Sequence, residues 1–143
     1  MSVQALRVKA KESEEMSEGH FNGWIGVDFD GTLVEYDRWR GPEHIGAAIT
    51  VMVLRVRHWL HEGRDVRIFT ARVYAPNDNP KKQCEAAIAM RVIQDWCLSQ
   101  FGTIIPVTCV KDFGMIELWD DRCVQVEPNT GRRVDGTEAA AKN

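Results

Sequence analysis

The sequence predicts a doubly wound, mostly parallel, Rossmann-like α/β domain with three layers (α/β/α) and no cap domain. Three observations support this fold class. Short apolar runs alternate with stretches of helical periodicity, polar residues follow several of the apolar runs, and a glycine closes each helical stretch. Because open parallel sheets bind ligands beyond the carboxyl ends of their strands, the polar residues there are the candidate functional residues.

The periodic stretches predict two helices and the apolar runs predict five strands. The first helix is expected over about 45–60, with Pro42 near its start and Gly63 just past its end. The second is expected from about 81 to 101, and Gly102 stops it. The strands are expected near 24–28, 66–70, 106–110, 115–119 and 123–127.

One connection in this scheme is too short. Only Lys111 to Gly114 separate the third strand from the fourth, whereas a parallel crossover normally takes a dozen or more residues. Two explanations stay open: the linking helix is reduced to a single turn, or one of the two strands is misassigned.

Size and composition predict one domain. The chain has 143 residues, of which 44% are hydrophobic and 27% charged, and its formal net charge is −3. We expect a folded body over 23–127, between a flexible N-terminal arm at 1–22 and a flexible C-terminal tail at 128–143. No apolar stretch reaches the length of a membrane span, so we expect a cytoplasmic protein with no membrane partner. The four cysteines lack zinc-site spacing and are expected to be buried, reduced thiols.

The most informative segment runs from Trp24 to Thr32, where an apolar run ends in Asp28 and Asp30, followed by Gly31. Residues i and i+2 of a strand share a side, so both carboxylates can face one small volume. Gly31 permits the turn and the close backbone approach that follow. Two anions held this close need a cation between them or a shared proton. The segment predicts Mg²⁺-dependent phosphoryl transfer through a carboxylate.

Three further polar elements follow in an order that suits the same site. Thr70 ends the second predicted strand, Lys111 follows the third, and Asp120 and Asp121 end the fourth. Each element has a plain structural alternative when taken alone. The Asp-x-Asp-Gly-Thr run is compatible with an Asx-type turn, and Thr70 with a simple strand end. Their combination at strand ends favours a site for phosphate chemistry.

Together these four motifs resemble those of the haloacid dehalogenase (HAD) superfamily of phosphatases and phosphotransferases, over roughly residues 24–126. The resemblance implies that Asp28 is the nucleophile, which forms an aspartyl-phosphate, and that Asp30 is the general acid and then the base. It also implies that Thr70 is a phosphate-binding hydroxyl and that Lys111 is the cation beside the nucleophile.

The resemblance further implies one Mg²⁺ cofactor. Its expected protein ligands are the Asp28 carboxylate, the Asp30 backbone carbonyl and Asp120, with Asp121 acting directly or through water. Neutral or basic donors must also help to hold a dianionic phosphate near so many carboxylates. The expected donors are the backbone N–H groups of Gly31 and Thr32 and the side chain of Arg72.

The expected function is therefore that of a Mg²⁺-dependent phosphatase. The intervals between the motifs leave no room for a cap, so the site should be open and suited to a bulky phosphorylated substrate, with nucleotides and nucleic-acid ends as the leading candidates. A partner subunit in a homo-oligomer could then serve as the lid. The alternative function is that of a catalytically weak HAD-like binding or regulatory protein, which Asp30 speaks against because pure binding does not need it.

The loop at 35–40 has two interpretations. Its aromatic and guanidinium groups can stack on bases and pair with phosphates, or Tyr36 and Trp39 can simply pack against the body. The stretch from Phe69 to Arg72 is also similar to the second motif of polynucleotide-kinase phosphatase domains and of some nucleotidases.

Overall fold

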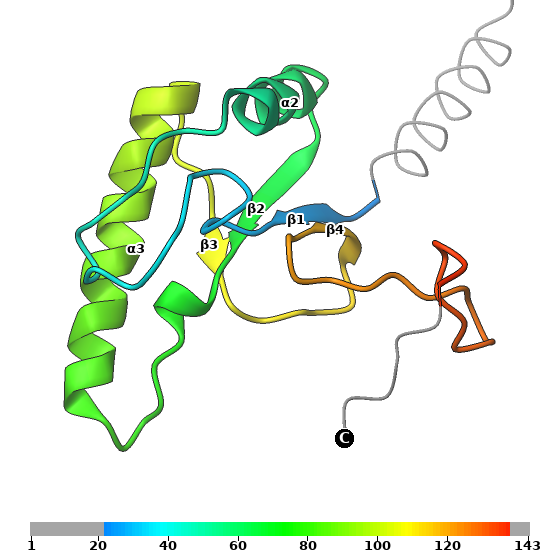
Figure 1. The fold of residues 1–143 in the computed structure, drawn as a ribbon. Coiled ribbons are helices and arrows are strands. Elements are labelled where there is room, and N and C mark those ends of the chain that lie inside the picture. Colours follow the sequence, from blue (N-terminus) through cyan, green and yellow to red (C-terminus); the bar gives the residue numbers. More distant parts are fainter. Residues whose placement is uncertain (1–21, 138–143) are drawn as a thin grey trace, which may run out of the picture.

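The computed structural model describes residues 22–137, which form a four-stranded parallel sheet flanked by helices (Figure 1). The elements are β1 (Trp24–Val27), α2 (Thr50–His61), β2 (Asp65–Phe69), the 3-10 turn η1 (Ala71–Val73), α3 (Pro80–Phe101), β3 (Val107–Thr108) and β4 (Met115–Trp119). All three strand pairs are parallel. The predicted parallel, Rossmann-like α/β fold is confirmed, while the predicted arm at 1–22 lies outside the described residues except for Asn22.

The strand order β3-β2-β1-β4 makes the sheet doubly wound. The chain moves from β1 through β2 to the β3 edge, and then returns to place β4 on the other side of β1. Winding therefore reverses between β1 and β4, which is the position where open α/β sheets hold their ligands.

The hydrophobic core lies between the sheet and the two helices. Alternate residues of β1 and β2 point into it, namely Ile25, Val27, Val66 and Ile68, each at most 3% exposed. They meet the buried stripe of α2 (Met52, Val53, Val56 and Trp59) and Ile93 and Cys97 of α3. The Arg57 guanidinium also links the helices by donating to the Gln100 carbonyl at 3.0 and 2.9 Å.

Helix α3 has the limits that the sequence predicts. The Asn79 side chain accepts a hydrogen bond from the backbone N–H of Lys82 at 3.1 Å and caps the first turn, and Pro80 occupies the first turn. Gly102 ends the helix with a φ of 71°, a conformation that glycine adopts without strain.

Helix α2 begins at Thr50, later than the predicted start at 45. Residues before it are held in an extended path instead, because Val34 and Ala48 form an antiparallel bridge and the Ile49 N–H donates to the Leu33 carbonyl at 2.8 Å. A Cβ on Gly46 would overlap the carbonyl oxygen of Glu35, so this pairing requires glycine. Residues 35–48 thus form a loop closed at its base by the 34–48 bridge.

The short connection between the third and fourth strands contains no helix. Instead β3 is only two residues long, and residues 109–114 connect it to β4 as an irregular segment that ends in a turn at 113–114. The Asp112 carboxylate fixes this connection by accepting hydrogen bonds from Trp24 Nε1 at 2.7 Å and from the Gly114 N–H at 2.8 Å. In the described residues, this segment occupies the place of a linking helix.

The predicted strand at 123–127 is wrong. Val126 pairs only with Arg133 in an isolated antiparallel bridge, and Val124 and Val126 stay more than half exposed. The alternating apolar residues have no neighbouring strand of the sheet to pair with. The chain instead turns back on itself over 125–134. Of the predicted tail at 128–143, residues up to 137 take part in this turn or follow it, and 138–143 lie outside the described range.

Two smaller expectations also have an outcome. Cys97 is buried as expected, but Cys84 and Cys123 are exposed and Cys109 is intermediate. Within residues 22–137, no helix is both long and apolar enough to cross a membrane.

Candidate active site at the ends of β1 and β4

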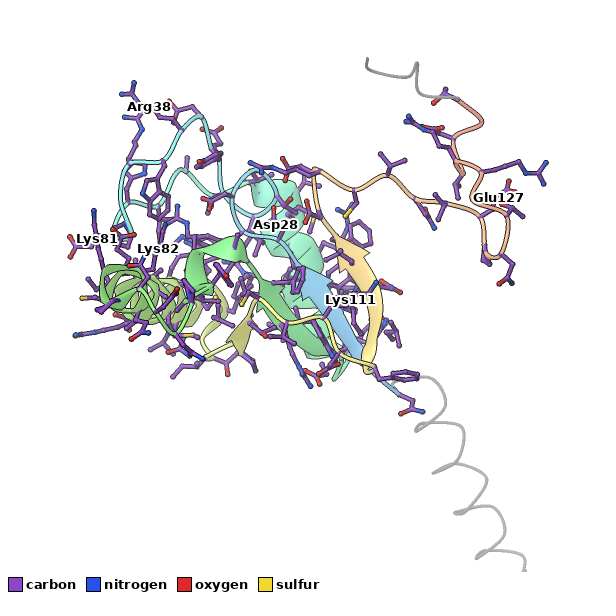
Figure 2. The ribbon with its side chains drawn as sticks, turned by 90° about the horizontal axis from the view of Figure 1, so that it is seen from below. Asp28, Arg38, Lys81, Lys82, Lys111 and Glu127 are labelled. Carbon is purple, nitrogen blue, oxygen red and sulfur yellow. The ribbon has the colours of Figure 1, made fainter. Side chains whose placement is uncertain are left out.

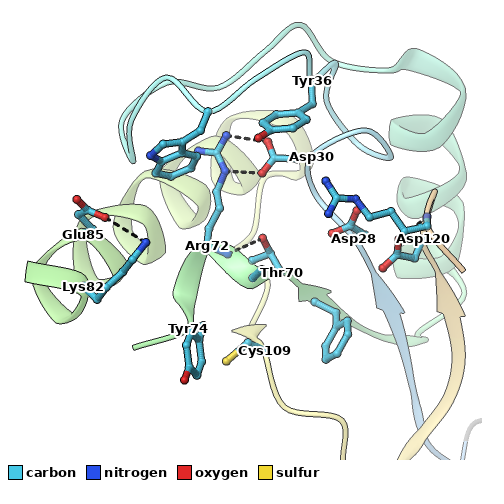
Figure 3. Close-up of a pocket in the computed structure, with 14 residues that line it drawn as sticks. Asp28, Asp30, Tyr36, Thr70, Arg72, Tyr74, Lys82, Glu85, Cys109 and Asp120 are labelled. Atoms are coloured by element: carbon cyan, nitrogen blue, oxygen red, sulfur yellow. Dashed lines mark hydrogen bonds and ion pairs between the residues drawn. The ribbon is translucent and has the colours of Figure 1, made fainter. Parts of the chain in front are cut away.

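The register of β1 and β4 brings the two key aspartates together. Val27 pairs with Trp119, and the Asp28 N–H donates to the Trp119 carbonyl at 2.8 Å. The next residue on each strand is an aspartate, so Asp28 and Asp120 leave the sheet side by side (Figure 3). The Trp119 ring packs on Trp59 of α2, with ring centroids 5.1 Å apart, and this contact anchors the end of β4.

Asp28, Asp120 and Asp121 form an acidic triad, with one carboxylate oxygen of each within 4.8 Å of the others. No basic side chain of residues 22–137 forms an ion pair with any of them. Desolvation by burial, the charge of Asp120 and a hydrogen bond with Asp121 raise the pKa of Asp28 to about 7. Carboxylates brought together without a compensating cation fit a hard divalent cation such as Mg²⁺, which prefers oxygen ligands.

Asp121 is held in the triad by the turn that follows Asp30. Thr32 Oγ1 donates to Asp121 Oδ1 at 3.3 Å and accepts from the Asp121 N–H at 3.2 Å. Gly31 has a φ of 83°, and a Cβ there would lie 2.7 Å from Asp121 Oδ2. The glycine is therefore required both for the turn and for the close approach of Asp121.

The same turn corrects one expectation about phosphate binding. The Gly31 N–H donates to the Val34 carbonyl at 2.8 Å, and the Thr32 N–H donates to the Phe29 carbonyl at 3.2 Å. These two N–H groups are used inside the turn and are not free donors. Gly31 and Thr32 instead position Asp121.

Asp30 lies on the cavity side of the strand end, because Phe29 between the two acids points into the core. Phe29 is fully buried and meets Trp96 edge to face, with ring centroids 5.2 Å apart. The Asp30 carboxylate receives two hydrogen bonds from Arg72, from Nε and Nη2, both at 2.7 Å (Figure 3). This pair is well shielded, since the side chains of Arg72 and Asp30 are only 4% and 18% exposed.

Arg72 is also tied to the loop at 35–48. Its Nη1 donates to the His44 carbonyl at 2.8 Å, and its guanidinium lies 5.1 Å from the ring centre of Trp39 and 5.6 Å from that of Phe29. Arg72 was expected to be a free phosphate donor. In this structure its guanidinium is engaged by Asp30, and it connects the strand end to the loop.

Thr70 is buried at the end of β2 and faces the cavity. Its Oγ1 accepts a hydrogen bond from the Arg72 N–H at 3.2 Å, which caps the short η1 turn. No described residue accepts the hydroxyl hydrogen, so the hydroxyl is positioned to donate into the cavity.

Lys111 does not line the cavity. It is exposed on the 109–114 connection, as Figure 2 shows, and makes no ion pair or hydrogen bond within the described residues. The charge of Lys111 acts on the thiol of Cys123, whose pKa the triad also influences. Burial and the three triad carboxylates raise the pKa of that thiol, while Lys111 lowers it.

The cavity has a volume of about 580 Å³ and contains both acids of the first motif. Its lining combines Asp28, Asp30, Asp120, Thr70, Arg72 and Arg122 with Tyr36, Trp39, Phe69, Ala71, Tyr74, Lys82, Glu85 and Cys109. Tyr36 and Trp39 thus line the cavity while staying 40% and 46% exposed. Arg40 is taken up by an ion pair with Asp37 at 2.6 Å.

Sequence reasoning missed Phe69, Cys109 and Glu85 as cavity residues. Position offers a signal for two of them, since Phe69 ends β2 and Cys109 directly follows β3. Glu85 lies one turn into α3 beside Lys82, with their charged atoms 3.7 Å apart, and nothing in the sequence pattern marks it.

No protein-family model matches the chain, and no curated protein matches it. Among solved structures, the chain is similar to a conserved protein from Bacteroides thetaiotaomicron, with 21% sequence identity and a TM-score of 0.47. The similarity covers 82% of each chain.

Proposed function

We propose that the protein is a Mg²⁺-dependent phosphoric monoester hydrolase that works through an aspartyl-phosphate on Asp28. The observation that carries this proposal is the convergence of Asp28, Asp120 and Asp121 to within 4.8 Å at the point where the winding of the sheet reverses. Thr70 and Asp30 face the same cavity, so a nucleophile, a hydroxyl donor and a second acid are available to one substrate.

The triad would hold the cation through Asp28, Asp120 and Asp121. Mg²⁺ bound there would supply positive charge that favours the ionised form of Asp28 and neutralises the phosphate. Four carboxylates meet in this region, and Arg72 already balances Asp30. The uncompensated charge is therefore that of the triad, which matches the place expected for the cation.

The chain's own residues account for both chemical steps. An Asp28 oxygen attacks phosphorus while the bond to the leaving oxygen breaks, and the Thr70 hydroxyl donates to a phosphoryl oxygen. Asp30 gives a proton to the leaving oxygen, and then takes one from the water that hydrolyses the aspartyl-phosphate.

The Asp30–Arg72 pair places a condition on this mechanism. Both oxygens of the Asp30 carboxylate accept hydrogen bonds from Arg72, so Asp30 must be released from Arg72 before it can give a proton to the leaving oxygen. The anionic phosphate of a substrate competes for the same guanidinium. We therefore propose that Arg72 moves from Asp30 to the substrate as the phosphate enters.

The alternative, a binding protein that turns over poorly, is favoured by one observation. Lys111, expected beside the nucleophile, lies outside the cavity. The expected cytoplasmic location and the homo-oligomer with a partner subunit as lid both stay predictions.

Phosphate release from an aryl phosphate tests the proposal. Asp28→Asn should reduce Mg²⁺-dependent release at least about a thousandfold, because the amide cannot form the covalent intermediate. Asp95→Asn is the matched control, since Asp95 is exposed on α3 and does not line the cavity. Equal rates for Asp28→Asn and the wild type, or full activity in EDTA, would reject the mechanism.

A further inference from the structure

Four aromatic residues line the cavity. Tyr36 and Trp39 come from the 35–48 loop, Phe69 from the end of β2, and Tyr74 from just after η1. Tyr74 is 60% exposed, and Tyr36 and Trp39 are exposed by nearly half. In Figure 3, Tyr74, Lys82 and Glu85 lie on the side of the cavity opposite Asp28 and Asp120, while Tyr36 lies beside Asp30. One opening thus combines a site for phosphate chemistry with a set of exposed π-surfaces.

Trp39 is held more firmly than a loop residue usually is. The Arg72 guanidinium lies between the rings of Trp39 and Phe29, at 5.1 and 5.6 Å from their centres. Arg72 is itself fixed by two 2.7 Å bonds to Asp30 and by its bond to the His44 carbonyl. A half-exposed indole supported in this way is preorganised before the ligand binds, so a ligand that stacks on it has little ordering cost.

We propose that the cavity binds a nucleotide phosphate, with the base stacked on Trp39 and the phosphate at the triad. This inference rests on the proposed function and names its substrate class. A base offers a planar π-face, and stacking on an aromatic side chain is tolerant of sequence because every base has such a face. The cavity volume of about 580 Å³ lies within the usual range for small-molecule sites.

A sugar phosphate without a base fits this aromatic lining poorly. Away from the acids, the polar side chains Lys82 and Glu85 pair with each other at 3.7 Å, and much of the remaining lining is aromatic or apolar. Sugar hydroxyls placed against Phe69, Ala71 or the ring of Trp39 would lose hydrogen bonds to water without replacing them. The base therefore accounts for the part of the cavity that the phosphate does not use.

The nucleotide can be free or can end a nucleic-acid strand. Arg38 and Lys81 are exposed cations on the side of the molecule that carries the 35–40 loop and the start of α3 (Figure 2). Further phosphates of a strand leaving the cavity would meet them. Both sources share the stacked base and are separated by the test.

The test measures binding rather than turnover. Asp28→Asn protein is titrated calorimetrically in Mg²⁺ with adenosine 5′- and 3′-monophosphate and with ribose 5-phosphate, and the result is the ratio of nucleotide to sugar-phosphate affinity. We expect a ratio of about fivefold or more, since base stacking on an aromatic side chain typically contributes a factor of about 5 to 150. Adding Trp39→Leu should lower the ratio about fivefold or more, whereas Trp39→Phe should keep most of it.

Phe113→Leu, added to the same Asp28→Asn protein, is the matched control. Phe113 is a fully exposed aromatic residue outside the cavity, and its loss should leave the ratio unchanged. Using a ratio cancels any effect of Trp39→Leu on the shared phosphate site. A ratio near one with Trp39 present, or a ratio that Trp39→Leu does not change, would overturn the proposal.

Phosphorylated oligonucleotides complete the experiment. Tighter binding than the mononucleotide, with a steep dependence on salt, supports a strand end, and equal binding supports a free nucleotide. If the affinity ratio depends on Trp39 but the wild type releases no phosphate from any of these ligands, the proposal of nucleotide binding is supported and the proposed hydrolysis is rejected. If phosphate is released at equal rates from nucleotides and sugar phosphates, and the affinity ratio is near one, the proposed hydrolysis is supported and nucleotide binding is rejected.

Discussion

The two ends of the cavity are held by different kinds of contact. At the acidic end, Asp28 and Asp120 leave adjacent strands whose register is fixed by backbone hydrogen bonds, including Asp28 N–H to Trp119 O at 2.8 Å. At the aromatic end, Trp39 belongs to a loop whose contacts with the strand ends include the side chain of Arg72. A rigid sheet edge suits chemistry, which needs accurate placement, and a loop suits recognition, which tolerates variation.

The comparison shows that Arg72 is the link between the two ends. It contacts Asp30, the acid of the proposed chemistry, and it supports Trp39, the proposed platform for the base. A change at this residue should therefore disturb both Asp30 and Trp39 but leave the triad intact, while a change confined to either end should leave the other intact.

Arg72→Lys is expected to give the largest effect among variants that spare the triad. A lysine cannot make two parallel bonds to the phosphate that Arg72 is proposed to bind, so the catalytic rate constant should fall about 10- to 100-fold, in line with the strength of hydrogen bonds between charged groups. Mg²⁺ affinity, measured calorimetrically, should stay the same because Arg72 does not contact the triad. Arg91→Lys, an exposed site on α3, is the control, and a loss of Mg²⁺ affinity in Arg72→Lys would break the separation of the two ends.

Gly31→Ala should weaken the acidic end alone. The substitution combines a strained backbone with a clash against Asp121, so we expect a loss of about 2–3 kcal/mol in the free energy of unfolding and weaker Mg²⁺ binding. Gly63→Ala is the matched control, because Gly63 has a φ of 80° but no atom within 4 Å of an added Cβ. It should cost only about 1 kcal/mol. Equal losses measured by urea unfolding would show that Asp121 does not depend on this contact.

The smallest expected effect is a dependence of stability on pH. Because the pKa of Asp28 is raised from 3.8 to about 7, the folded protein keeps a proton that the unfolded chain loses. The stabilisation is fully present below pH 3.8 and is lost as the pH rises to about 7. In EDTA, the unfolding free energy of the wild type should fall relative to that of Asp28→Asn across this range. A difference that does not change with pH would mean that Asp28 titrates normally and that the triad is less crowded than described.

The sequence predicted the parts that depend on strand periodicity and on residues at strand ends. Asp28, Asp30, Thr70 and Asp120 all line the cavity, because parallel strands place their carboxyl ends at one edge. The limits of α3 were also predictable, since Asn79, Pro80 and Gly102 are local capping signals.

The parts that depend on tertiary pairing were not predictable. The contacts of Arg72 with His44 and Trp39 require the 35–48 loop to lie over the strand ends, and the Val34–Ala48 bridge, which replaces the expected start of α2, closes that loop. The free N–H groups expected at Gly31 and Thr32 are used within their own turn. A strand at 123–127 needed a neighbour in the sheet, and apolar alternation does not say whether one is present.

The most direct test of the central claim is to trap the covalent intermediate. The wild type is quenched during turnover of an aryl phosphate with Mg²⁺ and treated with borohydride, which reduces an aspartyl-phosphate to homoserine, and its peptides are then analysed by mass spectrometry. We expect homoserine at position 28 with Mg²⁺ and none in EDTA. Continued phosphate release with position 28 unmodified, or modification at a different residue, would contradict it.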